Sequence, residues 1–185
     1  MFIEVNTIVK LQKSGGGDMV NQINVNWGGN EIILKWFPKK VLSNNEVITS
    51  VHSYCFDQNK VLLVQVKDRG FNIPGGHLES GETPEEALHR EVYEEAYVKG
   101  NNIEYLGAIE VNHTNNRNFN PNGPYPLIGY QLFYRMDIAQ CYPFLRGNET
   151  QSRIWVEQEI VPFVLNDHQL LHLILKQALN VNVMK

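Results

Sequence analysis

The sequence predicts an α+β fold in which helices pack on a mixed β-sheet. Several short segments combine β-branched residues with alternating apolar and polar positions, a pattern that is typical of strands. Residues 83–99 carry the start signals of a helix, and residues 167–179 have the apolar periodicity of an amphipathic helix. Strands and helices mixed in this order favour an α+β sheet over a regular βαβ array.

The first 46 residues differ in character from the rest of the chain. Ser14 to Asp18, SGGGD, is a flexible break between segments that read as strands: FIEVNTIVKL, QINVNW and EIILKWF. We therefore expect residues 1–46 to form a β-rich N-terminal extension and residues 47–185 to form the main domain. Met19 is an alternative start of the native chain.

From Val47 onward the elements are predicted one by one. The turn-like sequence Asp57-Gln58-Asn59 lies between two apolar segments and predicts a hairpin of residues 47–56 with 60–67. The later segments at residues 103–112, 128–138 and 153–157 also read as strands. The connection of residues 113–126 is long and rich in Asn, Gly and Pro, so it is either a surface loop or a lid over a substrate.

The predicted helix after the hairpin has a well-marked start. Thr83 is placed to cap it, Pro84 occupies the first helical position, and Glu86 is three residues after the cap, as a capping box requires. We expect the helix to end near Lys99 and Gly100. Glu85 and Glu86 are then explained by capping and by the helix dipole.

Composition limits the classes of partner. The 185-residue chain has a formal net charge of −4 and no long Lys/Arg run, which disfavours nucleic-acid polymers and anionic membranes as partners. The start of the chain lacks the pattern of a signal peptide, and no run of about eighteen apolar residues is present. Two cysteines far apart suggest reduced thiols, and together these features predict a cytoplasmic protein.

Acidic residues are concentrated between positions 79 and 95, around a single arginine, Arg90. On a helical wheel Glu91, Glu94 and Glu95 fall within about 100°, beside the apolar stripe instead of opposite to it. Carboxylates at this spacing repel by roughly 3 kcal/mol at an effective dielectric of about 20. Arg90 can neutralise Glu94 or Glu82, and the remaining carboxylates need a cation. Hard oxygen ligands of this kind favour Mg²⁺ or Mn²⁺, and these ions in turn favour a phosphate substrate.

A glycine pair comes shortly before these glutamates. Gly75 and Gly76 allow a backbone bend that a side chain would obstruct, and they can aim a carbonyl or an amide at a metal–phosphate unit. The turn and the helix are therefore predicted to build one site.

These residues resemble a known family. The pattern is similar to the signature of the Nudix hydrolases: Gly76, five residues, Glu82, seven residues, Arg90-Glu91-Val92, one residue, Glu94-Glu95, one residue, Tyr97-Val98. The one departure is Tyr97, where the family has glycine. The resemblance implies an α/β/α sandwich from about Val47 to the C-terminus. Because Tyr97 follows the glutamates, it puts the geometry of the helix end in doubt more than the binding of a metal.

The resemblance also implies roles for particular residues. The metal ligands are expected among Glu91, Glu94, Glu95 and the Gly75 carbonyl, with Glu82 and Arg90 positioning them by charge pairing. The implied reaction is Mg²⁺- or Mn²⁺-dependent hydrolysis of a nucleoside diphosphate linked to another group, and we expect Glu91, Glu94, Arg90 and Glu82 to take part in catalysis. Glu149 is the candidate for the distal glutamate that this family often uses from a later loop.

Other interpretations stay open at this point. A Nudix-fold binding or sensor module without turnover is the main alternative to an enzyme, and an isoprenoid isomerase of similar fold is a weaker one. His77 either contacts a phosphate or is simply exposed. His168 and His172 read as ordinary helix residues, because the segment lacks the glutamate of a zinc protease helix. A homodimer is compatible with the sequence, which identifies neither the nucleotide nor the general base.

Overall fold

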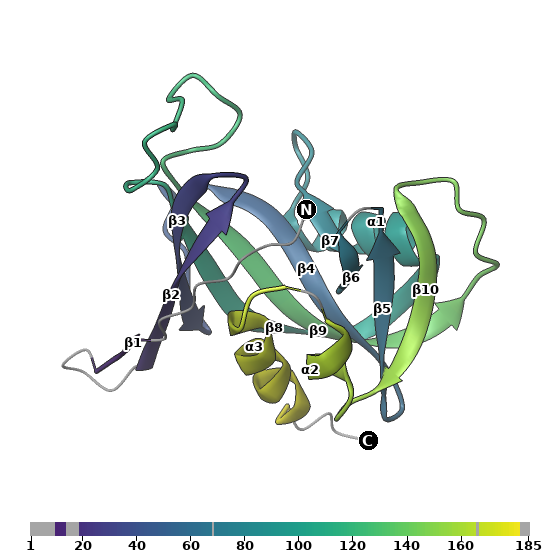
Figure 1. Ribbon diagram of the computed structural model, residues 1–185. Helices are drawn as coiled ribbons and strands as arrows, with labels where there is room; N and C mark the ends of the chain where they lie inside the picture. Colours follow the sequence, from purple (N-terminus) through teal and green to yellow (C-terminus); the bar gives the residue numbers. More distant parts are fainter. Residues whose placement is uncertain (1–9, 14–18, 68, 166, 182–185) are drawn as a thin grey trace. The chain divides into compact units, whose positions relative to one another are not determined.

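The computed structural model describes residues 10–13, 19–67, 69–165 and 167–181 (Figure 1). The chain divides into two compact units, Met1–Thr49 with Gly107–Leu132, and Ser50–Leu106 with Phe133–Lys185. Both combine strands in antiparallel pairs, and the helices belong to the second unit. The predicted α+β class is confirmed. No helix among the described residues is long and apolar enough to cross a membrane.

The first unit contains the N-terminal strands. In it β1 (Lys10–Lys13), β2 (Met19–Trp27) and β3 (Asn30–Pro38) pair in sequence order, and β3 pairs with the end of β8 (Val98–Asn112). Alternate residues of β3 are buried because successive side chains of a strand point to opposite faces. The β-rich character expected for this segment is confirmed, although most of the strand predicted at residues 2–11 lies outside the described residues.

The connection of residues 113–127 also belongs to the first unit. Three asparagine side chains accept hydrogen bonds from backbone N–H groups two residues later, at 2.9–3.0 Å, and each bond closes a tight turn: Asn112, Asn116 and Asn120. Asn118 Nδ2 also donates to Asn30 Oδ1 at 3.2 Å. The connection is thus ordered in large part by its own asparagine side chains. A role as a lid over a substrate stays a prediction.

The second unit holds the predicted hairpin. β4 (Ile48–Asp57) and β5 (Lys60–Val66) pair antiparallel, with Cys55 opposite Leu62. β5 also pairs with β10 (Thr150–Glu157) and β6 (Gly70–Asn72), and β4 pairs with β7 (Gly75–His77). β9 (Ile128–Cys141) lies between β8 and β4 in the strand order. The hairpin prediction is confirmed.

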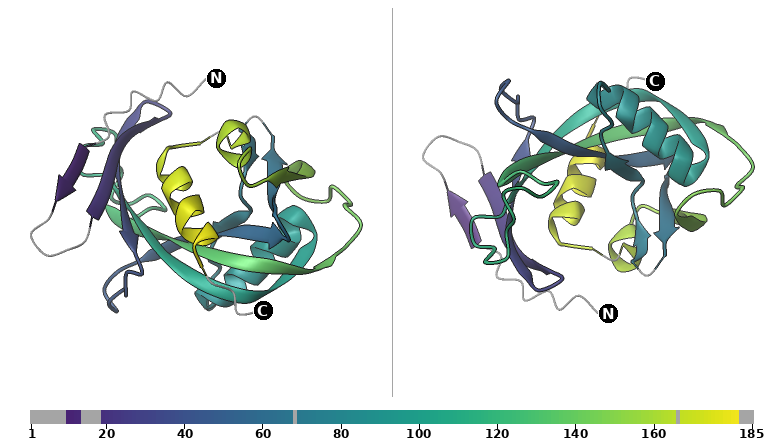
Figure 2. Two further views of the ribbon diagram at one scale, coloured as in Figure 1. Left: turned by 90° about the horizontal axis from the view of Figure 1, so that it is seen from below. Right: turned by 90° about the horizontal axis from the view of Figure 1, so that it is seen from above.

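Helices α1 (Pro84–Ala96) and α3 (Leu170–Leu179) lie against opposite faces of the strands of this unit (Figure 2). α3 is held by apolar packing and by the buried Tyr54 hydroxyl, which donates to the Leu171 carbonyl at 2.6 Å. The sequence prediction missed the one-turn helix α2 (Val161–Val164) before it. α3 itself starts at Leu170, three residues later than predicted.

The start of α1 agrees with the prediction, but its end does not. Thr83 and Glu86 form the complete capping box, and Pro84 opens the first turn. The helix ends at Ala96 instead of near Lys99, because Tyr97 adopts the left-handed conformation (φ 54°, ψ 41°) and β8 begins at the next residue. The residue at the unusual motif position therefore terminates the helix.

Candidate active site

The glycine pair lies in β7, against the neighbouring strand and α1. Gly75 (φ 156°) pairs with His52 of β4, and a Cβ at this position would collide with the Val51 carbonyl. A Cβ on Gly76 would come within 2.5 Å of the Glu91 carboxylate. The first glycine is thus needed for the close approach of β4, and the second leaves the space that the Glu91 carboxylate fills.

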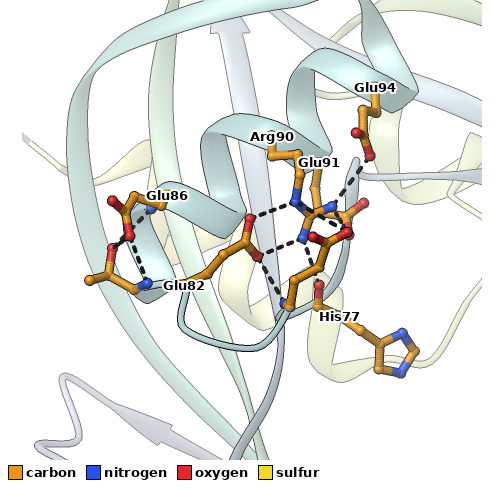
Figure 3. A network of polar contacts seen from close by, with 8 residues as sticks. His77, Glu82, Glu86, Arg90, Glu91 and Glu94 are labelled. Atoms are coloured by element: carbon orange, nitrogen blue, oxygen red, sulfur yellow. Dashed lines mark hydrogen bonds and ion pairs between the residues drawn. The ribbon is translucent and has the colours of Figure 1, made fainter.

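Arg90 is the centre of a polar network that joins the turn to α1 (Figure 3). Its guanidinium holds Glu82 with two bonds, from Nε at 2.7 Å and from Nη2 at 2.8 Å. Nη1 donates to Glu91 at 2.9 Å and to Glu94 at 3.3 Å, and Nη2 also donates to the His77 carbonyl at 2.9 Å. The predicted pairing with Glu82 or Glu94 is present for both, and the planar fork of arginine makes the Glu82 contact bidentate.

Electrostatics in this network favour the charged forms of Arg90 and Glu82. The hydrogen bonds from Arg90, helped by the Glu79 N–H, lower the pKa of the Glu82 carboxyl to about 2. The same carboxylate raises the pKa of Arg90 above its ordinary value. Glu82 therefore stays ionised and holds the Arg90 guanidinium against the turn that precedes α1.

Two further carboxyl groups lie in a less favourable environment. The Glu95 carboxylate accepts a hydrogen bond from the Gly75 N–H at 2.9 Å, yet burial, with repulsion from Glu91, raises its pKa to about 7. Burial also raises the pKa of Glu91, against the opposing effect of Arg90. Both side chains lie next to the glycine turn, so negative charge accumulates there without full compensation.

These donors fit a hard divalent cation in kind. Carboxylate oxygens and a backbone carbonyl are the ligands that Mg²⁺ and Mn²⁺ prefer, and a cation would relieve the repulsion between Glu91 and Glu95. The Glu94 side chain is 46% exposed and turned toward Arg90. Within the described ranges, no three His, Cys, Asp or Glu side chains are gathered closely enough to hold a metal ion. A shared site would thus need the Glu94 carboxylate to rotate toward the turn, and the ligand roles stay predictions.

The remaining candidates differ in how close they lie to this cluster. Glu149, just before β10, has a side chain that is 79% exposed, and it lies 3.6 Å from Arg69; its charge contributes to the raised pKa of Glu95. His77 is exposed in the turn and binds Arg90 through its backbone carbonyl. The substrate contacts of both residues stay predictions.

Tyr97 is accommodated by its surroundings. Its side chain is only 7% exposed, its hydroxyl accepts a hydrogen bond from the Gly147 N–H at 2.9 Å, and its ring meets Phe144 edge-on at 5.2 Å. A left-handed conformation is unfavourable for a residue with a Cβ, and these contacts offset that penalty. The departure from the family pattern leaves the glutamates of α1 in place.

Sequence reasoning missed the side chains that hold the end of α1. Asn148, Thr150 and Arg153 all donate hydrogen bonds to carbonyls at this end, at positions that the prediction treated as a loop and a plain strand. His168 is buried just before α3, and His172 lies within α3, as expected of ordinary structural residues. Trp155 has the Arg153 guanidinium over its ring.

Comparison with known proteins identifies the family of this chain. A family model, the NUDIX domain, matches residues 48–171. The chain belongs to the Nudix hydrolase family. This membership confirms both the resemblance seen in the motif and the expected class of enzyme, a hydrolase of phosphoanhydride bonds.

Relatives and solved structures agree with this family. The 8-oxo-dGTP diphosphatase of Haemophilus influenzae is 30% identical over 115 residues, which cover 60% of this Nudix chain and 75% of that protein. The "Putative 8-oxo-dGTP diphosphatase YtkD" of Bacillus subtilis is 42% identical over 57 residues, 31% of this chain and only 36% of that protein. The crystal structure of the Bacillus subtilis pyrophosphohydrolase BsRppH has a TM-score of 0.65 at 21% identity, over 84% of this chain and 95% of that one. The last likeness confirms the Nudix fold.

Proposed function

We propose that this protein is a Mg²⁺- or Mn²⁺-dependent pyrophosphohydrolase that cleaves the diphosphate linkage of a nucleoside diphosphate joined to another group. The observation that carries the proposal is the placing of two partly buried, poorly compensated carboxyl groups, Glu91 and Glu95, beside the Gly75–Gly76 turn. Such a group suits a cation-assisted reaction on a phosphate substrate.

Glu91, Glu94, Glu95 and the Gly75 carbonyl would hold the cation in this proposal. When bound, it would neutralise charge on the diphosphate and make an attacking water molecule more acidic. Glu149 and His77 are proposed to contact the substrate or its phosphates. Arg90, itself oriented by Glu82, would keep the Glu91 carboxylate in place through its Nη1. The Glu94 carboxylate, which also accepts from this Nη1, would turn from it toward the cation.

The chemical step is an ordinary hydrolysis. The water oxygen forms a bond to one phosphorus, the bond from that phosphorus to the bridging oxygen breaks, and the second phosphate leaves with the bridging oxygen. The proton that the water loses goes to a carboxylate of the cluster, for which Glu91 and Glu94 are the candidates. A raised pKa brings Glu91 nearer to the working range of a general base.

Nucleoside triphosphates are the first substrates to test, because the curated relatives are named for a diphosphatase reaction on 8-oxo-dGTP. We propose small nucleotides as partners, with no nucleic-acid polymer, in a cytoplasmic setting; a homodimer remains compatible. The sensor alternative rested on Tyr97 and on the N-terminal segment outside the motif, and the packing of Tyr97 does not favour it.

The test is a panel that contains 8-oxo-dGTP, dGTP, other nucleoside triphosphates and nucleotide sugars. Phosphate and pyrophosphate release is measured with Mg²⁺, with Mn²⁺ and after chelation by EDTA, with Glu91→Gln as the inactive control. We expect metal-dependent release that rises toward alkaline pH. Hydrolysis that survives thorough chelation would overturn the proposal, and tight nucleotide binding without turnover would establish the sensor alternative.

A further inference from the structure

The end of α1 is held by side chains from a distant part of the chain. The last carbonyls of a helix have no partner within it and need other donors. Here Asn148 Nδ2 donates to the Glu94 carbonyl at 2.7 Å, and Thr150 Oγ1 donates to the Glu95 carbonyl at 2.6 Å. Arg153 Nη1 donates to the next two carbonyls, those of Ala96 and Tyr97. We call Asn148, Thr150 and Arg153 the β10 clamp.

Arg153 is itself fixed in the clamp. Its other terminal nitrogen, Nη2, donates to the Tyr142 carbonyl at 2.6 Å, and its guanidinium lies 5.4 Å from the Phe144 ring and 5.1 Å from the Trp155 ring. An arginine fork held on both sides loses little further freedom when it binds carbonyls. Arg153 is therefore preorganised on β10, whereas Asn148 contributes an exposed contact from just before that strand.

The clamped carbonyls belong to residues of the candidate site. Glu94 and Glu95 project their carboxylates toward Arg90 and Gly75, respectively, while their backbones bind Asn148 and Thr150. Glu95 is thus held at its carbonyl and at its carboxylate. The backbone contacts therefore help to fix the position of these carboxylates. Such positioning matters because small displacements of catalytic groups reduce rates strongly.

We propose that the β10 clamp is a positioning device for the metal-binding carboxylates of α1, an inference that rests on the proposed function. It supplies donors for the last carbonyls of the helix, beside the left-handed turn that Tyr97 makes in place of the usual glycine. It also sets the position of Glu149, which lies between two clamp residues, so that one segment fixes both the helix and the candidate distal glutamate.

Thr150→Val is the decisive variant, because valine keeps the shape of the buried threonine and removes the donor to the Glu95 carbonyl. Ser152→Ala is the matched control: it removes a hydroxyl from the same strand, but that hydroxyl donates to Gln65 and not to the helix. Thr150→Ser restores the donor. We expect Thr150→Val to lower kcat about tenfold at nearly constant KM, with Thr150→Ser and Ser152→Ala close to wild type.

Two further measurements separate positioning from general damage. Mn²⁺ binding to the protein without substrate, followed by electron paramagnetic resonance, should weaken severalfold in Thr150→Val. In the double variant with Glu95→Gln, the loss of kcat should be no greater than in Glu95→Gln alone, because Thr150 acts through that residue. Urea unfolding of each variant shows whether it is folded under the assay conditions.

Additive losses in the double variant, or equal kinetics and equal Mn²⁺ binding in Thr150→Val and Ser152→Ala, would overturn the clamp as a positioning device. A wild-type protein that hydrolyses no nucleotide would contradict the proposed function instead. In that case Mn²⁺ binding and amide hydrogen exchange of residues 93–98 still test the clamp. Faster exchange and weaker Mn²⁺ binding in Thr150→Val would support it, and unchanged values would reject it.

Discussion

The Glu95 carboxylate lies 2.9 Å from the backbone nitrogen of Gly75, and this bond joins α1 to the glycine turn. The bond lowers the pKa of the carboxyl group, but burial and the charge of Glu91 outweigh it and raise the pKa to about 7. An ordinary glutamate titrates near 4.5, so Glu95 changes its charge within the range in which a hydrolase works. The contact therefore couples the ionisation of one residue to the folding of the site.

We expect this coupling to appear in the pH dependence of stability. A carboxyl group whose folded pKa is raised contributes stability below its unfolded pKa and loses it as the pH rises through the folded value. With EDTA present, the unfolding free energy of wild type relative to Glu95→Gln should therefore fall between pH 4.5 and 7, by on the order of 1 to 3 kcal/mol. Urea titrations at several pH values measure this difference.

The comparison with Glu95→Gln is necessary because His52 acts in the opposite direction. Burial lowers the pKa of its imidazole to about 4, which makes stability rise with pH up to the ordinary pKa of 6.5. Both proteins contain His52, so its contribution cancels in the difference. A difference that does not change between pH 4.5 and 7 would show that Glu95 titrates normally.

Neutral replacements of the helix glutamates should separate chemistry from capping. We expect Glu91→Gln, Glu94→Gln and Glu95→Gln each to lower kcat/KM by at least about a hundredfold, roughly 3 kcal/mol of transition-state stabilisation. Glu85→Gln, in the first turn, should change it less than about threefold, because charge near a helix start acts on stability. If Glu85→Gln is as impaired as the others in kinetics and metal titration, the effect is on the whole helix and the localised site is wrong.

Tyr97 should matter more for stability than for catalysis. Tyr97→Gly relieves the left-handed backbone but removes a buried ring and the acceptor of the Gly147 N–H, so we expect a net loss of about 1 to 3 kcal/mol with catalysis retained. Tyr97→Phe removes only the hydroxyl and should lose less. Urea unfolding and steady-state kinetics measure both effects, and a large gain in turnover in Tyr97→Gly would mean that tyrosine impairs the site.

The connection of residues 113–127 should affect substrate use. Its length and composition suit a segment that orders over a substrate, so shortening Asn115 to Asn122 should raise KM or change substrate preference with the fold intact. Kinetics on the nucleotide panel, with circular dichroism as the control for folding, test this. Unchanged constants for every substrate would make it a plain surface connection.

Sequence reasoning succeeded where the signals were local. The start of α1 was predictable because the Thr83 cap, Pro84 and Glu86 act within one turn of the chain. The pairing of Arg90 with Glu82 and Glu94 was predictable from charge and spacing. The hairpin of β4 and β5 followed from a turn between two apolar segments.

It failed where partners are far apart in sequence. Nothing near Tyr97 indicates that a polar strand residue such as Thr150 will bind the carbonyl of Glu95, so the prediction extended the helix to Lys99. Besides its two bonds to Glu82, the Arg90 guanidinium also donates to Glu91 and to the His77 carbonyl. This arrangement depends on the folded turn, which the sequence alone does not define. The bounds of α3 and the short helix α2 likewise depend on tertiary packing.

The β10 clamp has a consequence for the order of folding. Its donors lie 54 to 57 residues away along the chain from the carbonyls that they bind. The start of α1 can form early from local contacts alone, whereas the carbonyls of Glu94, Glu95 and Ala96 lack their clamp donors until β10 pairs with β5. We therefore expect the helix to fray at that end in the unfolding transition state, and Glu94 and Glu95 to gain their native order last. Mutations at Thr150 should then speed unfolding more than they slow folding.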